Sequence, residues 1–395
     1  MYSELLAQLS HYLIRFQALW LHSPFYHGDV PWRGEFPQLY HALLALDEHE
    51  YIALDDCPDK LYEFLQQFIP DFQDWNTMPM CSQLSEENAL NKFLAVDVPG
   101  RKWQQMQAFI VGMQGLPGAE IKRVVDWCAG KSHLGRAAAH QRGWALRAIE
   151  RNPELCQQGQ LLAERFVPQS EFRCCDVLIA PPTFEAGERV IALHACGDLH
   201  RTLLRQWLAS ASQQLVLAPC CYHQWFNGEF QPLSQLAQQH NLHLDRTQVR
   251  LAVQEMVTSP PRIRKQVMQL KAWRLGFDEL QRELRGVDEY LPTPSLPNSA
   301  VNWGAEGVLL NLAGQKGLTI PPDMDLQCYV ERGEARFAKV KRLELAAHGF
   351  RRAIELWLVL DLVNFLQEGG CEVQLQQFCA REISPRNLQI LATRQ

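Results

Sequence analysis

The stretch that decides the fold of this 395-residue chain is VVDWCAGKSHLGR, residues 124–136. Two β-branched residues lead to Asp126, a run of small residues surrounds Gly130, and a helical segment starts near His133. Strand, tight turn and helix start in this order are typical of a loop that binds a nucleotide or another cofactor. Val125 stands where a phosphate-binding P-loop needs a glycine, and Gly130 and Gly135 alone do not make a dinucleotide loop. The stretch fits a looser acid-x-small-x-Gly loop, or a turn whose glycine serves only packing.

Short apolar runs alternate with helix-length segments from about residue 121 to 218. This alternation predicts right-handed crossovers and a doubly wound parallel sheet. Two alternating runs joined by Ser384-Pro385-Arg386 end the chain and predict a terminal antiparallel pair. The five predicted parallel strands are Val124–Val125, Trp144–Ile149, Phe172–Cys175, Val190–Leu193 and Leu215–Ala218, and the final pair is Glu372–Phe378 and Asn387–Thr393. The predicted fold class is therefore α/β, a Rossmann-like seven-stranded sheet with a terminal hairpin.

Helical spacing and proline-rich segments divide the chain further. Residues 1–95 show helical periodicity and predict a helical N-terminal region, and 96–245 hold the first part of the sheet domain. Residues 246–333 are polar and proline-rich, which predicts an insertion after the fifth strand. In residues 334–395 we expect one long helix, from Ala335 to Glu368, and the last two strands.

The composition is that of a globular protein, with 47% apolar and 21% charged residues. A net charge of −6 argues against a protein that coats nucleic acid through its total field, although a local basic patch remains open. The twelve cysteines contain no C-x-x-C pair and no disulfide framework. The start of the chain has an early acid and no basic segment, and the most apolar helical run, 353–365, is interrupted by Glu355 and Asp361. We expect a reduced, cytoplasmic protein without a membrane span.

Acidic and other reactive side chains follow the predicted strands, where open α/β sheets bind their ligands. Gly130 allows a close backbone approach, and Glu150, 20 residues further on, suits the two hydroxyls of a ribose. Asp176 ends the third strand and suits an adenine amino group. HACGDL (194–199) and APCCYH (218–223) follow the fourth and fifth strands, and such clusters are costly to bury without a purpose.

Four motifs carry a resemblance to a family. DWCAGKSHL (126–134) resembles the D-x-G-x-G-K-G-H-L loop of a class I methyltransferase family, with Cys128 and Ser132 in place of two glycines. LHACGDL (193–199) is similar to its L-H-x-C-G-D-L, PCCYH (219–223) to its C-C-Y-H, and FCAREISPRNL (378–388) to its motif ending in S-P-R-N-L. The family includes methyltransferase-like protein twenty-five, its paralogue and the glutathione S-transferase C-terminal domain-containing protein, and more distantly the acceptor-stem tRNA 2′-O-methyltransferases. The resemblance covers about residues 96–225 and 335–395.

This resemblance implies S-adenosylmethionine (SAM) as cofactor. It implies that the methionine part of SAM faces Asp126 and the loop, the ribose faces Glu150 and the adenine faces Asp176. Lys131 would meet the SAM carboxylate or a substrate phosphate, or it is simply solvated. The full set of predicted cofactor-binding residues is Asp126, Cys128, Gly130, Lys131, His133, Leu134, Glu150, Asp176 and His194.

Methyl transfer needs a group that takes the proton of the nucleophile. Asp198 and His194 are the first candidates for this role and His223 is the next, while the alternative for His194 is a hydrogen-bonded core histidine. Zinc would accept the nearby cysteines and histidines as ligands. The C-C-x-H spacing is not a usual zinc pattern, and adjacent cysteines on a strand should point apart. We therefore predict no metal and treat the cysteines as small buried fillers.

Basic residues suggest a partner. They are Arg336, Lys339, Lys341, Arg342, Arg351 and Arg352 in one run, Arg246, Arg250, Arg262, Arg264 and Lys265 in another, with Lys102 and Arg386. This Arg/Lys rim would contact the phosphates of an RNA substrate, or it forms a solvated helix face. Trp225 and Phe226 would stack on a base or belong to the core. Two functions follow: a SAM-dependent methyltransferase acting on RNA (tRNA or rRNA), otherwise on protein, or a non-catalytic SAM-binding module whose N-terminal helices bind a protein partner.

Overall fold

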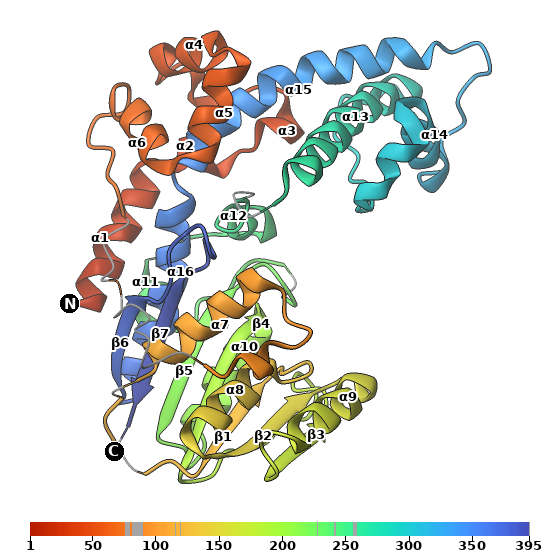
Figure 1. Ribbon diagram of the computed structural model, residues 1–395. Coiled ribbons are helices and arrows are strands. Elements are labelled where there is room, and N and C mark those ends of the chain that lie inside the picture. The colour runs from red at the N-terminus through yellow and green to blue at the C-terminus, as the bar shows by residue number, and fades with distance from the viewer. Residues whose placement is uncertain are drawn as a thin grey trace. The chain divides into compact units, whose positions relative to one another are not determined.

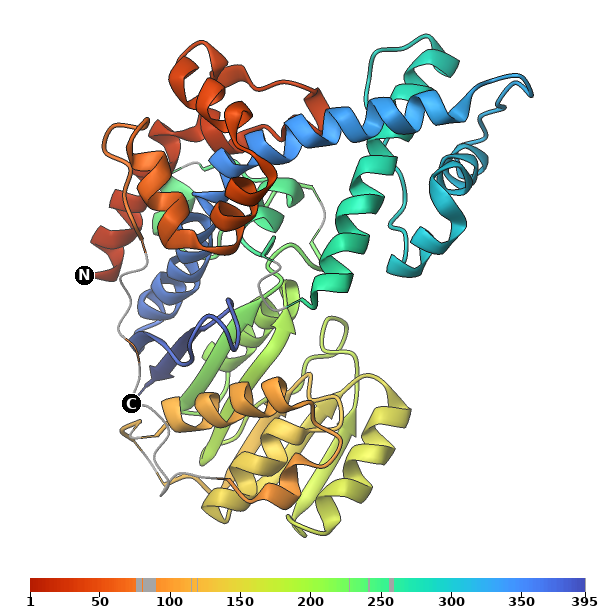
Figure 2. The same cartoon turned by 45° about the horizontal axis from the view of Figure 1, so that its top comes forward.

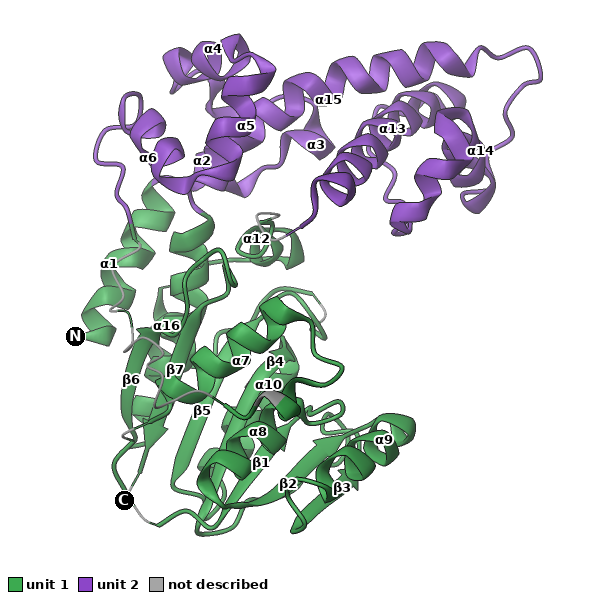
Figure 3. Ribbon diagram, in the orientation of Figure 1, with its two compact units in different colours: residues 1–15, 75–255, 351–395 green, residues 16–74, 256–350 purple. Residues whose placement is uncertain are grey.

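The computed structural model describes residues 1–75, 80, 90–114, 116–118, 120–226, 228–240, 242–255 and 259–394 (Figure 1). The chain forms two compact units, each described here by itself (Figure 3). The sheet unit comprises residues 1–15, 75–255 and 351–395, and the helical unit comprises 16–74 and 256–350. This division differs from the one expected from the sequence, because most of the N-terminal region belongs with the insertion. Parts of both predicted regions, 76–79, 81–89 and 256–258, lie outside the described residues.

The sheet has seven strands in the order β3-β2-β1-β4-β5-β7-β6. Neighbouring strands from β3 to β5 are parallel, and β7 runs antiparallel to β5 and to β6. The strand order reverses between β1 and β4, which is where ligands bind in open α/β sheets. The strands are β1 Arg123–Trp127, β2 Ala145–Glu150, β3 Ser170–Cys174, β4 Glu188–Cys196, β5 Gln214–Cys220, β6 Glu372–Gln377 and β7 Leu388–Thr393. The predicted Rossmann-like sheet of the class I methyltransferases, with its terminal hairpin, is confirmed.

Helices cover both faces of this sheet (Figures 1 and 2). On one face α7 and α8 contribute buried apolar side chains to a common core with β1, β2, β4 and β5. Close packing there depends on small residues: Ala137, Ala138 and Ala139 of α8 are fully buried. The helices of the sheet unit are α1 Tyr2–Arg15, η3 Lys92–Ala95, α7 Gly100–Gly112, α8 His133–Arg142, α9 Pro153–Glu164, α10 Asp198–Leu208, α11 Gln235–Gln239, α12 Arg246–Leu251 and α16 Arg351–Glu368.

The helical unit is built around α15, against which the helices α2 to α5 pack. Its second long helix, α13, crosses α15 at two glycines: a Cβ added to Gly333 would lie 2.3 Å from the backbone nitrogen of Gly276. Only glycine allows this approach of two helices. The elements are α2 Gln17–Leu21, α3 Pro24–His27, η1 Pro31–Arg33, α4 Pro37–Ala45, α5 Glu48–Asp56, α6 Pro58–Gln66, α13 Pro261–Arg285, η4 Asn298–Trp303, α14 Gly304–Gln315 and α15 Leu326–His348.

The single helix predicted from Ala335 to Glu368 is wrong. The chain forms two helices, and α15 ends at His348 before α16 begins at Arg351. Aromatic packing explains the interruption, because the ring of Phe350 is fully buried and lies 5.4 Å from the ring of Phe72 and 6.1 Å from that of Phe16. A helical period does not reveal such a break, which is imposed by packing partners far away in the sequence.

None of the described helices combines the length and the apolar character that crossing a membrane requires.

Candidate functional site

Hydrogen bonds to Asp126, a residue of β1, stabilise the loop that follows this strand. Oδ2 of Asp126 accepts hydrogen bonds from the Ser132 hydroxyl at 2.7 Å and from the Gly135 backbone N–H at 2.9 Å. The second contact satisfies one of the free N–H groups at the start of α8. Gly135 is required there because a Cβ at this position would lie 2.5 Å from the Ser132 hydroxyl oxygen. Asp126 is 3% exposed, so what its carboxylate contacts is the loop itself.

Burial raises the pKa of Asp126 to about 7, partly opposed by the hydrogen bonds from Ser132 and Gly135. The folded chain therefore binds this proton more readily than the unfolded chain between the ordinary value of 3.8 and about 7. Stability contributed by this group must fall as the pH rises through that window.

We expect an Asp126→Asn variant to lose this pH dependence, since an amide keeps an acceptor oxygen but does not titrate. The free energy of unfolding of the variant should rise relative to the wild type as the pH increases from about 4 to 7. Urea unfolding of both proteins at several pH values measures this difference. Parallel pH profiles of the two proteins would show that Asp126 titrates normally.

The loop alternates between ordinary and left-handed backbone conformations. Cys128 has φ 56°, Gly130 has φ 57° and Ser132 has φ 52°. A non-glycine residue pays about 1–2 kcal/mol in this region. The two positions at which this chain departs from the glycines of the resembled family are thus positions where glycine would be less strained.

A pair of substitutions at Cys128 tests this strain. Cys128→Gly should leave the free energy of unfolding unchanged or slightly higher, because the relief of strain offsets the greater entropy of the unfolded chain. Cys128→Val should lower it by about 1–2 kcal/mol, because a β-branched side chain fits poorly at positive φ. Denaturant titration of the three proteins gives the ranking. Equal stability of the valine and glycine variants would mean that the loop is not left-handed at this residue.

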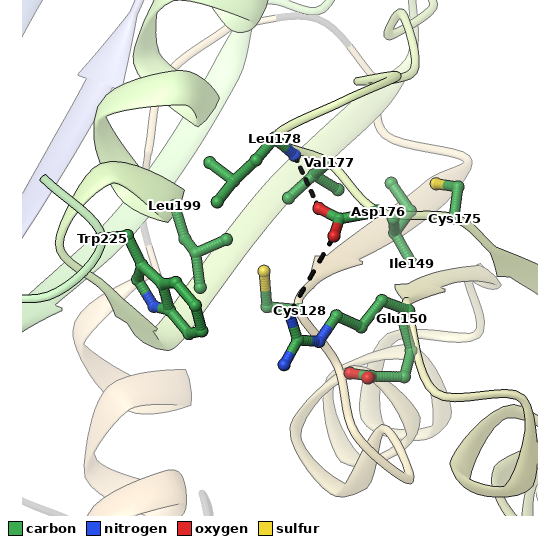
Figure 4. A pocket seen from close by; sticks show the side chains of 10 residues that line it. Cys128, Ile149, Glu150, Cys175, Asp176, Val177, Leu178, Leu199 and Trp225 are labelled. Atoms are coloured by element: carbon green, nitrogen blue, oxygen red, sulfur yellow. Dashed lines mark hydrogen bonds and ion pairs between the residues drawn. The ribbon is translucent and has the colours of Figure 1, made fainter.

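A pocket of about 210 Å³ opens beside this loop at the carboxyl ends of β1, β2 and β3 (Figure 4). Ile149, Val177 and Leu178 give it apolar walls, while the carboxylates of Glu150 and Asp176 provide hydrogen-bond acceptors. The remaining lining residues are Cys128, Arg151, Cys175, Leu199 and Trp225.

The two carboxylates of the pocket are held in place. Glu150 accepts from the Gly130 N–H through Oε2 and from the Asn152 N–H through Oε1, both at 2.9 Å. Asp176 accepts from the Leu178 N–H at 3.0 Å and lies 3.9 Å from the guanidinium of Arg151. Each oxygen retains a second lone pair for a ligand, so the pocket offers oriented acceptors.

Three of the predicted cofactor-binding residues line this pocket: Cys128, Glu150 and Asp176. The others do not line the pocket: Asp126 lies in β1, Gly130 and Lys131 in the loop, His133 and Leu134 at the start of α8, and His194 in β4. Among them, His133 is a neutral ring, because burial lowers its pKa to about 4 and Arg136 donates to its Nδ1 at 2.9 Å.

Trp225 is the lining residue that sequence reasoning placed elsewhere, as a stacking surface or a core residue. It is 48% exposed, with the Arg151 guanidinium 5.2 Å from its ring centre. Its φ is 65°, and no sequence pattern signals a left-handed backbone at a tryptophan. Phe226 packs against Phe230.

The three predicted catalytic residues lie at the ends of β4 and β5. His194 is within β4, because that strand continues past a register shift to Cys196. Its Nε2 is 3.0 Å from Oε1 of Gln105, and burial lowers the pKa of the ring. Asp198 begins α10, where burial raises its pKa although Arg201 lies 3.0 Å away.

His223 follows β5 and has its Nε2 3.2 Å from the Gln224 side-chain nitrogen. Its Nδ1 is buried and has no hydrogen-bond partner among the residues that the structure describes. Burial lowers the pKa of this imidazole as well. Because the amide N–H of Gln224 donates to Nε2, the neutral ring carries its proton on Nδ1, and its basic nitrogen is Nε2.

The expectation that adjacent cysteines point apart is wrong for Cys220 and Cys221. β5 ends at Cys220, and Cys221 has left the strand with φ 38°. The alternation of side chains along a strand therefore does not reach Cys221. Both thiols approach Cys196, and all three sulfur atoms lie within 4.8 Å of one another.

Four cations of the sheet unit act electrostatically on this edge. Lys102 and Arg386 lower the pKa of His194, and Arg250 and Arg246 lower that of His223, in each case after the larger effect of burial. Nη1 of Arg386 is buried and has no hydrogen-bond partner among the described residues. Four cations therefore lie near the predicted catalytic histidines, in a chain whose net charge is −6.

The basic residues of α13 and α15 form ion pairs within the helical unit. Arg336 pairs with Asp278 at 2.8 Å, and Lys341 pairs with Glu48 at 2.6 Å. Further pairs are Lys339 with Asp29, Arg342 with Glu48 and Arg264 with Asp56. These side chains tie α15 and α13 to the N-terminal helices.

Two comparisons relate this chain to known proteins. Residues 101–227 match the sequence model of a family described as "Methyltransferase domain". A crystal structure of coclaurine N-methyltransferase bound to N-methylheliamine and SAH matches with a TM-score of 0.25 at 16% identity. That match covers 54% of this chain and 61% of the length of that structure.

The pocket fits the cofactor that a methyltransferase domain implies, S-adenosylmethionine. Its apolar walls suit an adenine ring, and the carboxylates of Glu150 and Asp176 are oriented acceptors for ribose hydroxyls and an amino group. The pocket lies at the carboxyl ends of β1, β2 and β3, next to the point where the strand order reverses. Residues 101–227 therefore match a methyltransferase domain, the seven-stranded sheet has the class I fold, and the cofactor is S-adenosylmethionine.

Proposed function

We propose that the chain methylates RNA, with tRNA or rRNA as the substrate. The observation that carries this proposal is the group of four cations near His194 and His223, because phosphate contacts supply most of the affinity of an RNA-binding surface. The four sequence motifs support the narrower kinship with the methyltransferase-like protein twenty-five family, whose distant relatives act on tRNA.

Lys102, Arg246, Arg250 and Arg386 come from three separate segments of the sheet unit: α7, α12 and the connection between β6 and β7. Charges that converge from distant segments indicate an electrostatic site more strongly than a run along one helix does. The half-exposed ring of Trp225 adds a surface on which an unpaired base could stack.

Bound SAM supplies an electrophilic methyl group, and the chain must orient the nucleophile and take its proton. Asp198 is our first choice as proton acceptor, since its raised pKa brings it closer to neutral pH and it precedes the pocket residue Leu199. His223 is the second, and the nitrogen that would take the proton is Nε2, which faces the side-chain amide of Gln224. His194 is less suited, because Gln105 is bonded to one nitrogen and the thiol of Cys220 lies 3.8 Å from the other.

A second function, a SAM-binding or protein-interaction module without turnover, is favoured by one observation. Cys128 and Ser132 occupy left-handed positions in the loop, and a strained, bulkier loop could hold the cofactor without positioning its methyl group for transfer. In this case the helical unit would supply the partner-binding surface.

Two measurements separate these functions. Calorimetric titration with SAM and with S-adenosylhomocysteine comes first. If neither compound binds, the hypothesis that the chain is a methyltransferase is rejected. Transfer of tritium from labelled SAM into total RNA and total protein, from cells that lack this chain, comes second. We expect label in RNA; label only in protein would reject the proposed substrate, and SAM binding without transfer would support the non-catalytic module.

Charge reversal identifies the RNA surface. Exchanging Arg246 and Arg250 for glutamate should raise the KM for RNA at least tenfold and flatten its salt dependence, while leaving SAM affinity unchanged. Lys339→Glu in the helical unit, where the lysine lies 3.7 Å from Asp29, is the matched control. Equal effects of both changes would mean that RNA binding does not centre on the sheet unit.

A further inference from the structure

The three thiols at the ends of β4 and β5 form a compact cluster outside the cofactor pocket. Cys196 and Cys220 are 3.3 Å apart at their sulfur atoms, and Cys221 completes a set within 4.8 Å. Cys220 is buried and the other two are partly buried. None of the three lines the pocket, so the cofactor does not account for them.

His194 adds a nitrogen to this cluster. Its Nδ1 lies 3.8 Å from the sulfur of Cys220. Its Nε2 lies 3.0 Å from the amide oxygen of Gln105, and because that oxygen only accepts, Nε2 carries the proton. The lone pair of the neutral ring is then on Nδ1, the nitrogen that faces the thiols. Histidine ligands of metals are commonly oriented in this way, by a hydrogen bond from the opposite nitrogen.

Backbone strain brings these donors together. His194 has φ 70° and Cys221 has φ 38°, and the pairing of β4 with β5 shifts register between Leu193 and Cys196. Each such residue costs about 1–3 kcal/mol, and strain of this kind persists where the surroundings compensate for it. Metal–ligand bonds formed by both residues would provide that compensation.

The spacing suits a tetrahedral ion. With Zn–S bonds of about 2.3 Å and Zn–N bonds of about 2.0 Å, ligand sulfurs lie about 3.8 Å apart, and sulfur and nitrogen about 3.5 Å apart. The observed separations of 3.3 Å between the sulfurs of Cys196 and Cys220 and 3.8 Å between the Cys220 sulfur and Nδ1 of His194 need only small adjustments. The imidazole lies more than 4.8 Å from at least one of the other two sulfurs, so it moves closer when it binds the ion. Three thiolates and one zinc ion carry a charge of −1, and Arg386 is a cation that acts on both Cys196 and Cys221.

We infer that Cys196, Cys220, Cys221 and His194 form a structural zinc site. The alternative use of the cluster, a disulfide between Cys196 and Cys220, would explain neither the third thiol nor the orientation of the imidazole. The ion ties the carboxyl ends of β4 and β5 together and anchors the turn that leads to Trp225 in the cofactor pocket. With all four ligands supplied by the protein, the ion has no position for substrate.

Metal content of the purified full chain tests this site independently of activity. We expect about one zinc ion per chain by elemental analysis. Replacement by cobalt should give the sulfur-to-cobalt charge-transfer band and the visible bands of a tetrahedral thiolate site. Cys196→Ser and Cys221→Ser should lose the metal on dialysis against a chelator that leaves the wild type loaded. Cys174→Ser, at an exposed thiol of β3, is the control and should retain it.

The hydrogen bond between His194 and Gln105 can be tested in a protein that keeps all four proposed ligands. Gln105→Leu should weaken zinc binding about 10- to 100-fold. Wild-type protein that contains no zinc, takes up none on titration and is recovered with a Cys196–Cys220 disulfide would overturn the inference. SAM titration of the same samples keeps the outcomes separate, since loss of SAM binding alone concerns the proposed function, and loss of metal alone concerns this site.

Discussion

Replacing Asp198 by asparagine is expected to slow methyl transfer by about 100- to 10,000-fold, the usual contribution of a positioned proton acceptor. The affinity for SAM should change less than about twofold, because Asp198 does not line the cofactor pocket. Asparagine has nearly the same size and keeps a side-chain oxygen beside Arg201, whose Nε lies 3.0 Å from the carboxylate. What it cannot do is take a proton.

A pH profile distinguishes this role from a structural one. Burial raises the pKa of Asp198, so in the wild type the rate should rise with pH as this carboxyl loses its proton. The residual rate of the Asp198→Asn variant should lack that rise. His223→Gln serves as the comparison, because it removes the second candidate acceptor. An Asp198→Ala protein with full activity would refute the assignment, and a large loss only in the His223 variant would transfer the role to the imidazole.

Removing the Glu150 side chain is expected to raise the Kd for SAM by about 100- to 1,000-fold. A hydrogen bond to a charged group is worth about 1.5–3 kcal/mol, and a ribose offers this carboxylate two hydroxyls. Glu150 also accepts from the Gly130 N–H at 2.9 Å, so its loss releases the loop after β1. Calorimetry of the Glu150→Ala variant with SAM and with S-adenosylhomocysteine measures the effect.

Glu164→Ala provides the control for Glu150, since Glu164 is an exposed acid at the end of α9. Its affinity for SAM should equal that of the wild type. Adenosine competition separates the two contributions of Glu150. If the ribose contact dominates, the variant should lose affinity for adenosine and for SAM by similar factors. Unchanged binding of SAM by Glu150→Ala would mean that the pocket does not hold the ribose.

The sequence alone was sufficient to predict the architecture of the sheet. Alternating strand and helix periods are local properties, and right-handed crossovers leave few ways to arrange five parallel strands and a terminal pair. The acids Glu150 and Asp176 were found by the same logic, because each ends a strand and the carboxyl ends of parallel strands meet at one edge. Both line the pocket in the structure.

Other features were settled only by contacts between distant segments. The break between α15 and α16 depends on Phe16 and Phe72, and the run that looked like an RNA-binding face of α15 is paired with acids such as Asp278 and Glu48. Neither the helix break nor the ion pairs can be predicted from the spacing of apolar residues, because this spacing shows which face of a helix is apolar and not what covers it.

The cysteine cluster also could not be predicted from the sequence, because it depends on the backbone conformation of a single residue. Along a regular strand Cys220 and Cys221 would point to opposite faces, and the sequence contains no sign of the left-handed turn at Cys221. That turn, together with the register shift in β4, brings three sulfurs within 4.8 Å of one another and places the His194 imidazole 3.8 Å from the sulfur of Cys220. Strand order and the acids at the strand ends follow from patterns within the sequence. The direction of a side chain at a strained residue depends on a backbone angle that tertiary packing imposes.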